Sequence, residues 1–272
     1  MSNLMKNKRG LIMGVANDHS IAWGIAKALA EQGAKLCLTY QGEALKKRVQ
    51  PLAESIHADL ILPCDVKDDD CMQSLFGVLK QEWGKLDFIV HAIAFSDKNE
   101  LQGRYADTSR ANFINSMEIS VYSFTQACKY AAELMTDGGS CLTMTYLGAE
   151  KYIPNYNVMG VAKAALEASV RYLAFDLGPQ NIRVNAISAG PIRTLAASGI
   201  GNFRTMMDWN AINSAKRNNV TIDDIGQSAL YLLSDMSQNV TGEVIHVDAG
   251  ANKQGMINIT EKDQLTELLN SL

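Results

Sequence analysis

The stretch GLIMGVANDHSIAWG, residues 10–24, decides the fold of this chain. Its first residues form an apolar run typical of a buried strand, and a helix-forming pattern follows over 20–32. Between them Gly14 permits a sharp turn, Ser20 stands where it can cap the helix, and Gly24 lets the helix approach the sheet. The N-terminus of such a helix favours a diphosphate through its free N–H groups and dipole. The usual G-x-G-x-x-G is absent, so a plain strand-to-helix turn stays an open alternative.

The same alternation of apolar runs and amphipathic stretches continues toward both ends of the chain. Strands are expected at 10–15, 35–40, 59–63, 86–93, 139–145, 182–188 and 243–247. Helices are expected at 20–32, 42–56, 68–83, 109–135, 157–178 and 222–234. Near-continuous apolar strands are typical of a parallel sheet covered on both faces, and the alternation indicates right-handed βαβ units. We therefore predict an α/β fold, a single doubly wound Rossmann-type domain over 1–272 with a seven-stranded parallel sheet.

The region 190–219 breaks this rhythm. It opens with a Gly-Pro pair, carries two further glycines that offer hinges, and is rich in apolar groups. A long connection of this kind is usually a lid or a binding loop, and an extra core helix is the alternative. We predict a helical substrate-binding lid over 192–209, in which Phe203 and Met206 border the substrate.

Composition excludes several classes of protein. The apolar share of 47%, the charged share of 20% and the net charge of −4 are ordinary for a globular protein and argue against nucleic acid as a partner. The five cysteines are odd in number and form no CxxC, which suits a reducing compartment. No apolar run approaches a membrane span, the N-terminus lacks a signal core, and the four histidines show no metal-site spacing. We expect a cytoplasmic protein without a metal or a membrane partner.

The stretch YLGAEKYIPNYNVMGVAK, residues 146–163, carries the candidate chemistry. It holds two phenols, Tyr146 and Tyr156, and Lys163 follows the second by seven residues. Seven residues are about two helical turns, so Tyr156 and Lys163 share one face with a rise of roughly 10 Å between them. That separation suits two groups that hold opposite ends of one bound molecule. A phenol combined with an ammonium that holds a cofactor is typical of a reductase, although Tyr146 has the alternative of a packed aromatic.

The ends of the second and third strands predict how a dinucleotide would be held. Gln41 stands where an acidic residue normally binds the adenosine ribose, and its amide can still hydrogen-bond the hydroxyls. No cation follows immediately to receive a 2′-phosphate, which favours NADH over NADPH, although Lys46 and Lys47 lie within reach. Asp65 and Val66 suit the edge and face of the adenine. Asp65 alone has the alternative of a helix N-cap.

On these residues the chain resembles a known family, over about residues 8 to 250. It is similar to the bacterial NAD(P)H-dependent enoyl-acyl-carrier-protein reductases, a divergent branch of the short-chain dehydrogenase/reductases. The ordinary branch places its lysine four residues after the tyrosine. The matching segments are GVANDHSIAWGIA at 14–26, TYQ at 39–41, CDV at 64–66, YLGAE at 146–150, IPNYNVMGVAKAALEA at 153–168, RVNAISAGPIRTLAASGI at 183–200 and GEVIHVDAG at 242–250.

The resemblance implies that the chain reduces trans-2-enoyl-acyl-carrier-protein with NADH during type II fatty-acid synthesis, as a homotetramer. It implies a catalytic set of Tyr146, Tyr156 and Lys163. It places at NAD the residues Gly14, Ser20, Ile21, Gln41, Asp65, Val66, Ile93, Lys163, Ile192, Arg193, Thr194, Leu195 and Ala196. It places near the acyl substrate Ser96, Tyr146 and Tyr156, beside Phe203 and Met206 of the lid. A departure is Ala94, where many relatives carry Gly, so we expect an extra methyl group at the pocket that need not stop turnover.

From the residue types we expect Lys163 to hold the nicotinamide ribose and to favour the ionised form of the Tyr156 phenol. Two other functions stay open. A carbonyl or alcohol reductase on this fold needs a hydroxyl thirteen residues before the tyrosine and a lysine one turn after it. Those positions hold Thr143 and Gly160, so the lysine requirement fails. A protein that senses nicotinamide redox state without turnover would be expected to lose the tyrosine or the lysine, and both are present.

Overall fold

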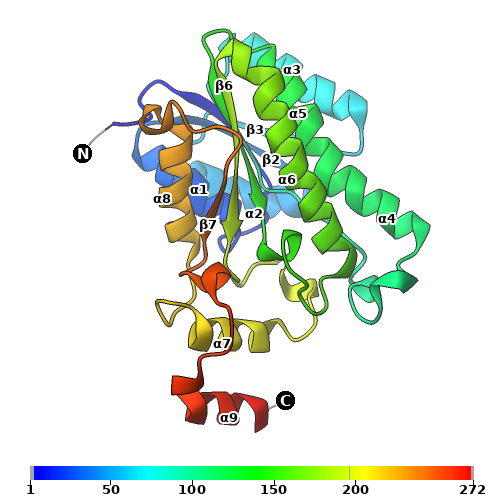
Figure 1. Cartoon of the computed structure of the whole chain (residues 1–272). Coiled ribbons are helices and arrows are strands. Elements are labelled where there is room, and N and C mark those ends of the chain that lie inside the picture. The colour runs from blue at the N-terminus through cyan, green and yellow to red at the C-terminus, as the bar shows by residue number, and fades with distance from the viewer. Residues whose placement is uncertain (1–2, 196, 271–272) are drawn as a thin grey trace.

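The computed structural model describes residues 3–195 and 197–270, which form a seven-stranded parallel sheet flanked by helices (Figure 1). The strand order is β3-β2-β1-β4-β5-β6-β7, and neighbouring strands pair in parallel, which confirms the predicted α/β fold. The strands are β1 (Arg9–Met13), β2 (Lys35–Tyr40), β3 (Leu60–Pro63), β4 (Phe88–His91), β5 (Gly139–Thr145), β6 (Ile182–Ala189) and β7 (Val244–Val247). The helices are α1 (Ile21–Glu31), α2 (Gly42–Ser55), α3 (Asp69–Trp83), α4 (Arg110–Met117), α5 (Ser123–Ala132), α6 (Asn157–Leu177), α7 (Phe203–Asn213), α8 (Ile222–Leu233) and α9 (Lys262–Asn270).

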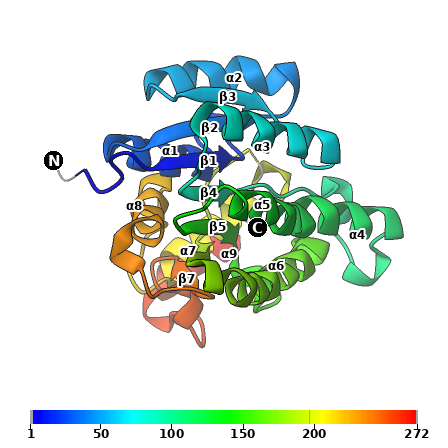
Figure 2. The same ribbon diagram turned by 90° about the horizontal axis from the view of Figure 1, so that it is seen from above.

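The sheet is buried on both faces, as its apolar strands predict. Figure 2 shows α3, α5 and α6 over one face and α1 and α8 over the other. Helix α2 packs into the same core as α1 and α8 through Val49 and Ala53. Successive side chains of a strand enter opposite cores: in β1, Leu11 and Met13 pack toward α5 and α6, whereas Ile12 packs toward α1 and α8. Burial of both cores is the main term that stabilises the fold.

The helices α1 and α8 approach so closely that two glycines are required. A Cβ atom on Gly24 would lie 2.3 Å from the carbonyl oxygen of Ile222, and one on Gly226 would lie 2.6 Å from the carbonyl oxygen of Gly24. Gly24 was expected to bring its helix close to the sheet, and that expectation is wrong. The glycine instead allows one helix backbone to touch another.

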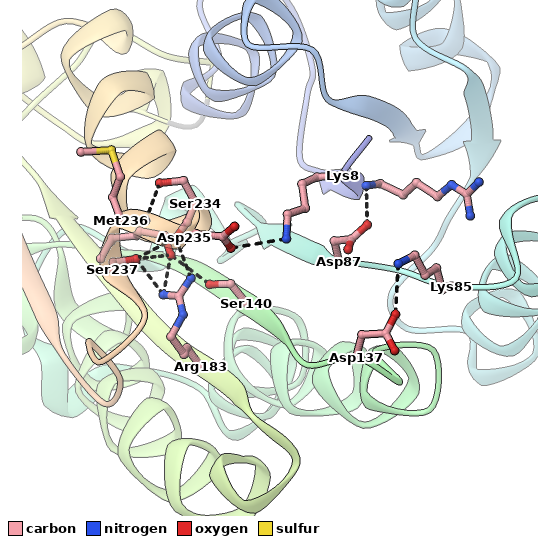
Figure 3. A network of polar contacts seen from close by, with 12 residues as sticks. Lys8, Lys85, Asp87, Asp137, Ser140, Arg183, Ser234, Asp235, Met236 and Ser237 are labelled. Carbon is pink, nitrogen blue, oxygen red and sulfur yellow. Dashed lines mark hydrogen bonds and ion pairs between the residues drawn. The ribbon is translucent and has the colours of Figure 1, made fainter. Parts of the chain in front are cut away.

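A polar network ties the amino end of the sheet together, at the edge opposite the carboxyl ends of the strands (Figure 3). The Arg183 guanidinium donates to the carbonyls of Leu232 and Ser234, just as α8 ends, and Ser140 donates to the same Leu232 carbonyl at 3.1 Å. The Asp87 carboxylate accepts the N–H of Arg9 at 2.7 Å. These bonds fix α8 against β5 and β6 and leave the other edge of the sheet for the site.

One segment differs from the sequence prediction. The helix expected over 109–135 is divided into α4 and α5 by a π-helical turn, Glu118–Tyr122. The region 190–219 contains α7, which packs beside α9 near the C-terminus (Figure 1). The action of 192–209 as a lid stays a prediction, and so does the assignment of 1–272 to a single domain. Within the described residues, no helix has both the length and the apolar character to cross a membrane.

Candidate active site

The predicted site residues gather along one edge of the sheet. All strands are parallel, so their carboxyl ends share that edge, and the chain order reverses between β1 and β4. Ligands of open α/β sheets bind in the crevice at such a reversal. The residues that follow successive strands at this edge are Gly14 after β1, Gln41 after β2, Asp65 after β3, Ile93 after β4, Tyr146 after β5 and Ile192 after β6.

The turn between β1 and α1 forms a cradle that only glycine fits. Gly14 has φ of +105°, and a Cβ atom there would lie 2.2 Å from the carbonyl oxygen of Ala92. Ser20 occupies the N-cap position of α1, but its Oγ accepts the N–H groups of Ala16 and Asn17 at 3.0 and 3.1 Å. The expectation that Ser20 caps the helix through its side chain is therefore wrong. The hydroxyl instead shapes the preceding turn, and α1 begins directly after it, at Ile21.

Gln41 and Asp65 lie together at the outer part of the crevice. The Gln41 Nε2 donates to the Asp65 Oδ2 at 2.9 Å, so the two polar groups predicted at the adenosine belong to one pair. The alternative role of Asp65 as a helix cap is wrong, because Asp68 accepts the Asp70 and Cys71 N–H groups at the start of α3. Lys46 lies 3.5 Å from a Glu43 carboxylate oxygen. Val66 is buried in the core beside this pair.

The two candidate phenols pack edge to face. Their ring centroids are 5.1 Å apart with an interplanar angle of 77°, and Tyr156 is 7% exposed at the N-cap position of α6. Gly148 makes room for this arrangement, since a Cβ atom there would lie 2.5 Å from the Tyr156 ring. The proline and asparagine before Tyr156 precede a helix that begins at Asn157, where the sequence predicted it.

Burial governs the acidity of both phenols. It raises the pKa of Tyr146 to about 12, with a smaller contribution from the Asp248 carboxylate. Burial, followed by the neighbouring Tyr146, also raises the pKa of Tyr156 above its ordinary value. This direction contradicts the expectation that Lys163 favours an ionised Tyr156. In this arrangement Tyr156 is a neutral O–H donor across the physiological range.

Lys163 lies on the inner face of α6, where it is 6% exposed. Its Nζ donates to the backbone carbonyl oxygen of Met144 at 2.8 Å, near the end of β5. Burial lowers the pKa of Lys163 to about 8, and the carboxylate of Glu167 acts in the opposite direction. The ammonium is therefore held beside the strand that leads into Tyr146, and its role at a cofactor stays a prediction.

The structure adds residues that the sequence analysis did not select. His91, at the end of β4, is fully buried, with its Nε2 2.7 Å from the Ser123 Oγ and its Nδ1 3.4 Å from the Thr143 Oγ1. Burial, and then the nearby Lys163, lower the pKa of His91 to about 3, so it is neutral. The π-helical turn presents Ser120, whose Oγ accepts the Phe95 N–H at 3.1 Å. The one sequence feature that could have indicated His91 is that it is a lone histidine within an apolar strand.

The substrate side is bounded by the segment after β4 and the start of the predicted lid. Ser96 shares hydrogen bonds with Asn112, at 3.2 Å to its Oδ1 and 3.0 Å to its Nδ2. Phe203 and Met206 are half-buried on α7. A hollow of about 370 Å³ opens between these segments, lined by Lys98, Asn99, Gln102, Gly199, Ile200 and Gly201.

The run after β6 is brought to the same edge. Ile192 is half-buried against the core beneath α1 and α8, Arg193 is exposed, and the Thr194 Oγ1 accepts the Ala197 N–H at 3.1 Å. Leu195 is 48% exposed. Ala196, also predicted at the cofactor, lies outside the described residues. Within the described part of the chain, no group of three or more His, Cys, Asp or Glu side chains is placed to hold a metal ion.

A doubly wound parallel sheet with a glycine cradle at its switch point and a buried tyrosine and lysine on one helix defines a nucleotide-dependent reductase of the Rossmann type. Comparison with known proteins makes this class specific. The family model described as enoyl-(acyl carrier protein) reductase matches residues 14–252. The chain belongs to the enoyl-(acyl carrier protein) reductase family.

Individual relatives agree over nearly the whole chain. The chain is 63% identical to enoyl-[acyl-carrier-protein] reductase [NADH] 2 of Rhizobium meliloti (strain 1021), covering 94% of this chain and 96% of that protein. A crystal structure of the enoyl-(acyl-carrier-protein) reductase from Anaplasma phagocytophilum in complex with NAD is 60% identical, with a TM-score of 0.92 over 95% of this chain and 98% of that one. The Bacillus cereus reductase, solved with NADP+ and an indole naphthyridinone, is 48% identical with a TM-score of 0.92, covering 94% and 100%.

Proposed function

We propose that this protein reduces trans-2-enoyl-acyl-carrier-protein to acyl-acyl-carrier-protein with NADH, in the elongation cycle of type II fatty-acid synthesis. The observation that carries the function is the edge-to-face pair of the half-buried Tyr146 and the buried Tyr156 at the carboxyl edge of the sheet. Lys163 lies two helical turns from Tyr156, not one, and it donates to the carbonyl oxygen of Met144. Family membership and relatives named for this reaction support the same substrate class.

The residues of the crevice fit a dinucleotide. The cradle at Gly14, which a Cβ atom would fill, brings a backbone turn and the N-terminus of α1 to one point, where a diphosphate is favoured. The Gln41–Asp65 pair offers hydrogen-bond groups to an adenosine. The groups proposed to hold NADH are Gly14, Ser20, Ile21, Gln41, Asp65, Val66, Ile93, Lys163 and the run 192–196. When bound, the cofactor supplies a hydride for the β-carbon of the enoyl group.

The phenol supplies the charge stabilisation. Reduction of an enoyl thioester places negative charge on the thioester oxygen, two bonds farther from the hydride acceptor than in a ketone. Tyr156, kept neutral by burial, donates its O–H to that oxygen and stabilises the enolate. The α-carbon then takes up a proton, either from Tyr156 or through a water relay, which completes the reduction. Tyr146, against its ring, orients the acyl chain, with Ser96, Phe203 and Met206 as further contacts. Lys163 holds the nicotinamide ribose.

Gln41 favours NADH over NADPH, because an amide brings no positive charge to a 2′-phosphate. Lys46, the nearest candidate cation, is already placed near Glu43 and 5.7 Å from the centre of the Tyr40 ring. We expect a higher kcat/KM with NADH than with NADPH in steady-state assays. Comparable efficiencies would show that Lys46 or Lys47 reaches the phosphate.

The acyl carrier protein is the proposed macromolecular partner. Arg193, Arg204, Lys216 and Arg217 are exposed around the predicted lid and offer positive charge to an acidic carrier. Such exposed charges guide encounter weakly and with strong salt dependence. The free cysteines Cys37, Cys64, Cys71, Cys128 and Cys141 suit a reducing compartment, and we place the enzyme in the cytoplasm.

Turnover with defined substrates tests the function. NADH oxidation followed with purified protein is expected with crotonyl thioester, faster on acyl carrier protein than on a short thiol, and much slower with simple ketones or aldehydes. If ketones were reduced faster than crotonyl thioester, a carbonyl reductase would replace the enoyl reductase. Binding of NADH without any turnover would favour a redox sensor.

Two substitutions separate the proposed roles within the site. Lys163→Met is expected to weaken NADH binding, measured by calorimetry, because it removes the group that holds the ribose. Tyr156→Phe should leave NADH affinity unchanged and lower kcat by about 10²–10⁴, the usual loss for a positioned proton donor. Unchanged affinity in Lys163→Met would rule out this assignment of the lysine.

A further inference from the structure

A buried carboxylate lies directly beyond Lys163 on the same helix. Glu167 follows Lys163 by four residues in α6, so the two side chains lie on one face, and they are 8% and 6% exposed. The Thr145 Oγ1 donates to the Glu167 Oε1 at 2.7 Å, while the Lys163 Nζ donates to the carbonyl of Met144 at 2.8 Å. Both ends of this charged pair are therefore fastened to neighbouring residues of β5, immediately before Tyr146.

The surroundings of the pair make Glu167 the group that stabilises a charged lysine. From β4, His91 faces Lys163 and is neutral, because its pKa is lowered to about 3. Burial raises the pKa of Glu167, opposed mainly by the Thr145 hydrogen bond, with Arg171 and His246 acting in the same direction as Thr145. The Glu150 carboxylate, whose Oε1 lies 2.7 Å from the His246 Nε2, raises the pKa of Glu167 and so acts against Thr145, Arg171 and His246.

The hydrogen bond from Thr145 does not require the charge of Glu167. A glutamine could accept the Thr145 hydroxyl equally well and would avoid the free energy lost when a carboxylate is taken out of water. A buried carboxylate one turn from a buried lysine indicates instead that its negative charge is needed. A buried lysine stays protonated only when a nearby negative charge offsets the hydration that its ammonium has lost.

We propose that Glu167 is a positioning residue of the active site: its carboxylate, held by Thr145, keeps Lys163 protonated and directed at the end of β5. This inference rests on the proposed role of Lys163 in holding the nicotinamide ribose. Glu167 touches neither substrate nor cofactor and acts through the lysine. Its loss impairs cofactor binding only in the pH range where Lys163 keeps its charge with the carboxylate present and loses it without.

The first arm of the test measures Lys163 alone, without ligand. NMR of ε-¹³C-lysine-labelled protein, with the Lys163 signal assigned by its loss in Lys163→Met, reports the lysine titration directly. Glu167→Gln is expected to lower the pKa of Lys163 by about one unit from the wild-type value of about 8. Glu167→Asp keeps the charge and should titrate nearer to wild type. Glu82→Gln, an exposed carboxylate of α3, is the matched control and should change nothing. An unchanged titration in Glu167→Gln overturns the proposal.

The second arm measures NADH affinity by calorimetry at pH 6 and pH 8. At pH 6 Lys163 is charged in both proteins, so Glu167→Gln should bind NADH like wild type. At pH 8 it should bind about fivefold more weakly, the ratio of charged lysine expected for a shift of about one unit. A loss of equal size at both pH values would identify a purely structural role and overturn the proposal. If Lys163→Met binds NADH normally, the proposed role of Lys163 fails, while the first arm still decides whether Glu167 controls the lysine.

Discussion

At the scale of single residues, burial decides the chemistry of this site. Tyr156, Lys163 and His91 are all nearly inaccessible, and burial shifts each pKa toward the neutral form. Tyr156 is thereby a donor rather than a phenolate, and His91 is a fixed hydrogen-bond partner rather than a cation. Of the three, only Lys163 has a pKa close to physiological pH, about 8, so its neighbours decide whether it is charged.

His91 predicts how the protein responds to acid. Its pKa falls from 6.5 in the unfolded chain to about 3 in the folded protein, so the unfolded state binds more protons between these values. The stability present above pH 6.5 is therefore lost as pH falls toward 3. At pH 4 the loss due to His91 is about 3 kcal/mol relative to pH 7.

Urea unfolding at pH 7 and pH 4 measures this effect. His91→Gln cannot bind a proton, so its unfolding free energy should fall less between the two pH values, by about that 3 kcal/mol. Identical pH dependence in the variant and the wild type would show that His91 does not contribute to acid sensitivity.

At the scale of elements, the close contact between α1 and α8 rests on missing side chains. Gly24→Ala would drive a methyl group into the Ile222 carbonyl, 2.3 Å from its Cβ position, so the two helices must separate. We expect a loss of about 1–3 kcal/mol in unfolding free energy, the usual range for overpacking. Gly77→Ala, in the middle of α3 where a Cβ meets nothing within 4 Å, is the control. It should stabilise by up to about 1 kcal/mol, since alanine favours a helix more than glycine does. Equal effects of the two substitutions would contradict the contact.

The predicted lid, 192–209, is the second prediction at this scale. It combines a short 3₁₀ turn, Ala197–Gly199, with the start of α7, and the Asn155 side chain reaches it by a 3.1 Å hydrogen bond to the Gly201 carbonyl. Hydrogen exchange should be fast in this segment without ligand and slow with NADH and an acyl mimic, because its ordering depends on the bound molecules. Amides of β5 serve as the control and should change little. Equal protection of 192–209 in both states would count against a lid.

At the scale of the whole molecule, α4, the π-helical turn and α6 present aromatic and aliphatic side chains to solvent. Tyr172 is 76% exposed and Phe175 86% exposed on α6, and Tyr122 is 58% exposed on the π-helical turn. Large exposed apolar groups of this kind are typical of a protein interface. We propose that they form an isologous contact in a homotetramer.

Light scattering after size exclusion measures the assembly. A tetramer with two-fold axes that loses one isologous contact leaves dimers, so Phe175→Glu with Tyr172→Glu should halve the mass. Leu4→Glu, a substitution of similar kind near the N-terminus, should leave the tetramer intact. A wild-type protein that runs as a monomer would refute the assembly, and an unchanged mass in the double variant would refute this interface.

The sequence and the structure agree on the fold because its signals are local. Apolar runs and helical periodicity predicted each strand of the sheet to within about two residues at most boundaries, and parallel strands necessarily bring the residues that follow them to one edge. Gly14, Gln41 and Asp65 were predicted at the site for that reason, whereas Tyr146 was predicted there as a candidate phenol. The π-helical turn was not predicted, because a single turn with i→i+5 hydrogen bonds is too short to change the periodicity of the surrounding helix.

What the sequence by itself determined is the doubly wound sheet, the edge that holds the site, and the phenols and lysine available there. What only the tertiary structure decided is which partners those groups have. The Met144 carbonyl on Lys163, the Thr145 hydroxyl on Glu167 and the Ile222 carbonyl against Gly24 join segments distant in the chain. Periodicity describes neighbours along a helix or strand, whereas such contacts depend on how whole elements pack, and that packing also sets the burial that shifts each pKa.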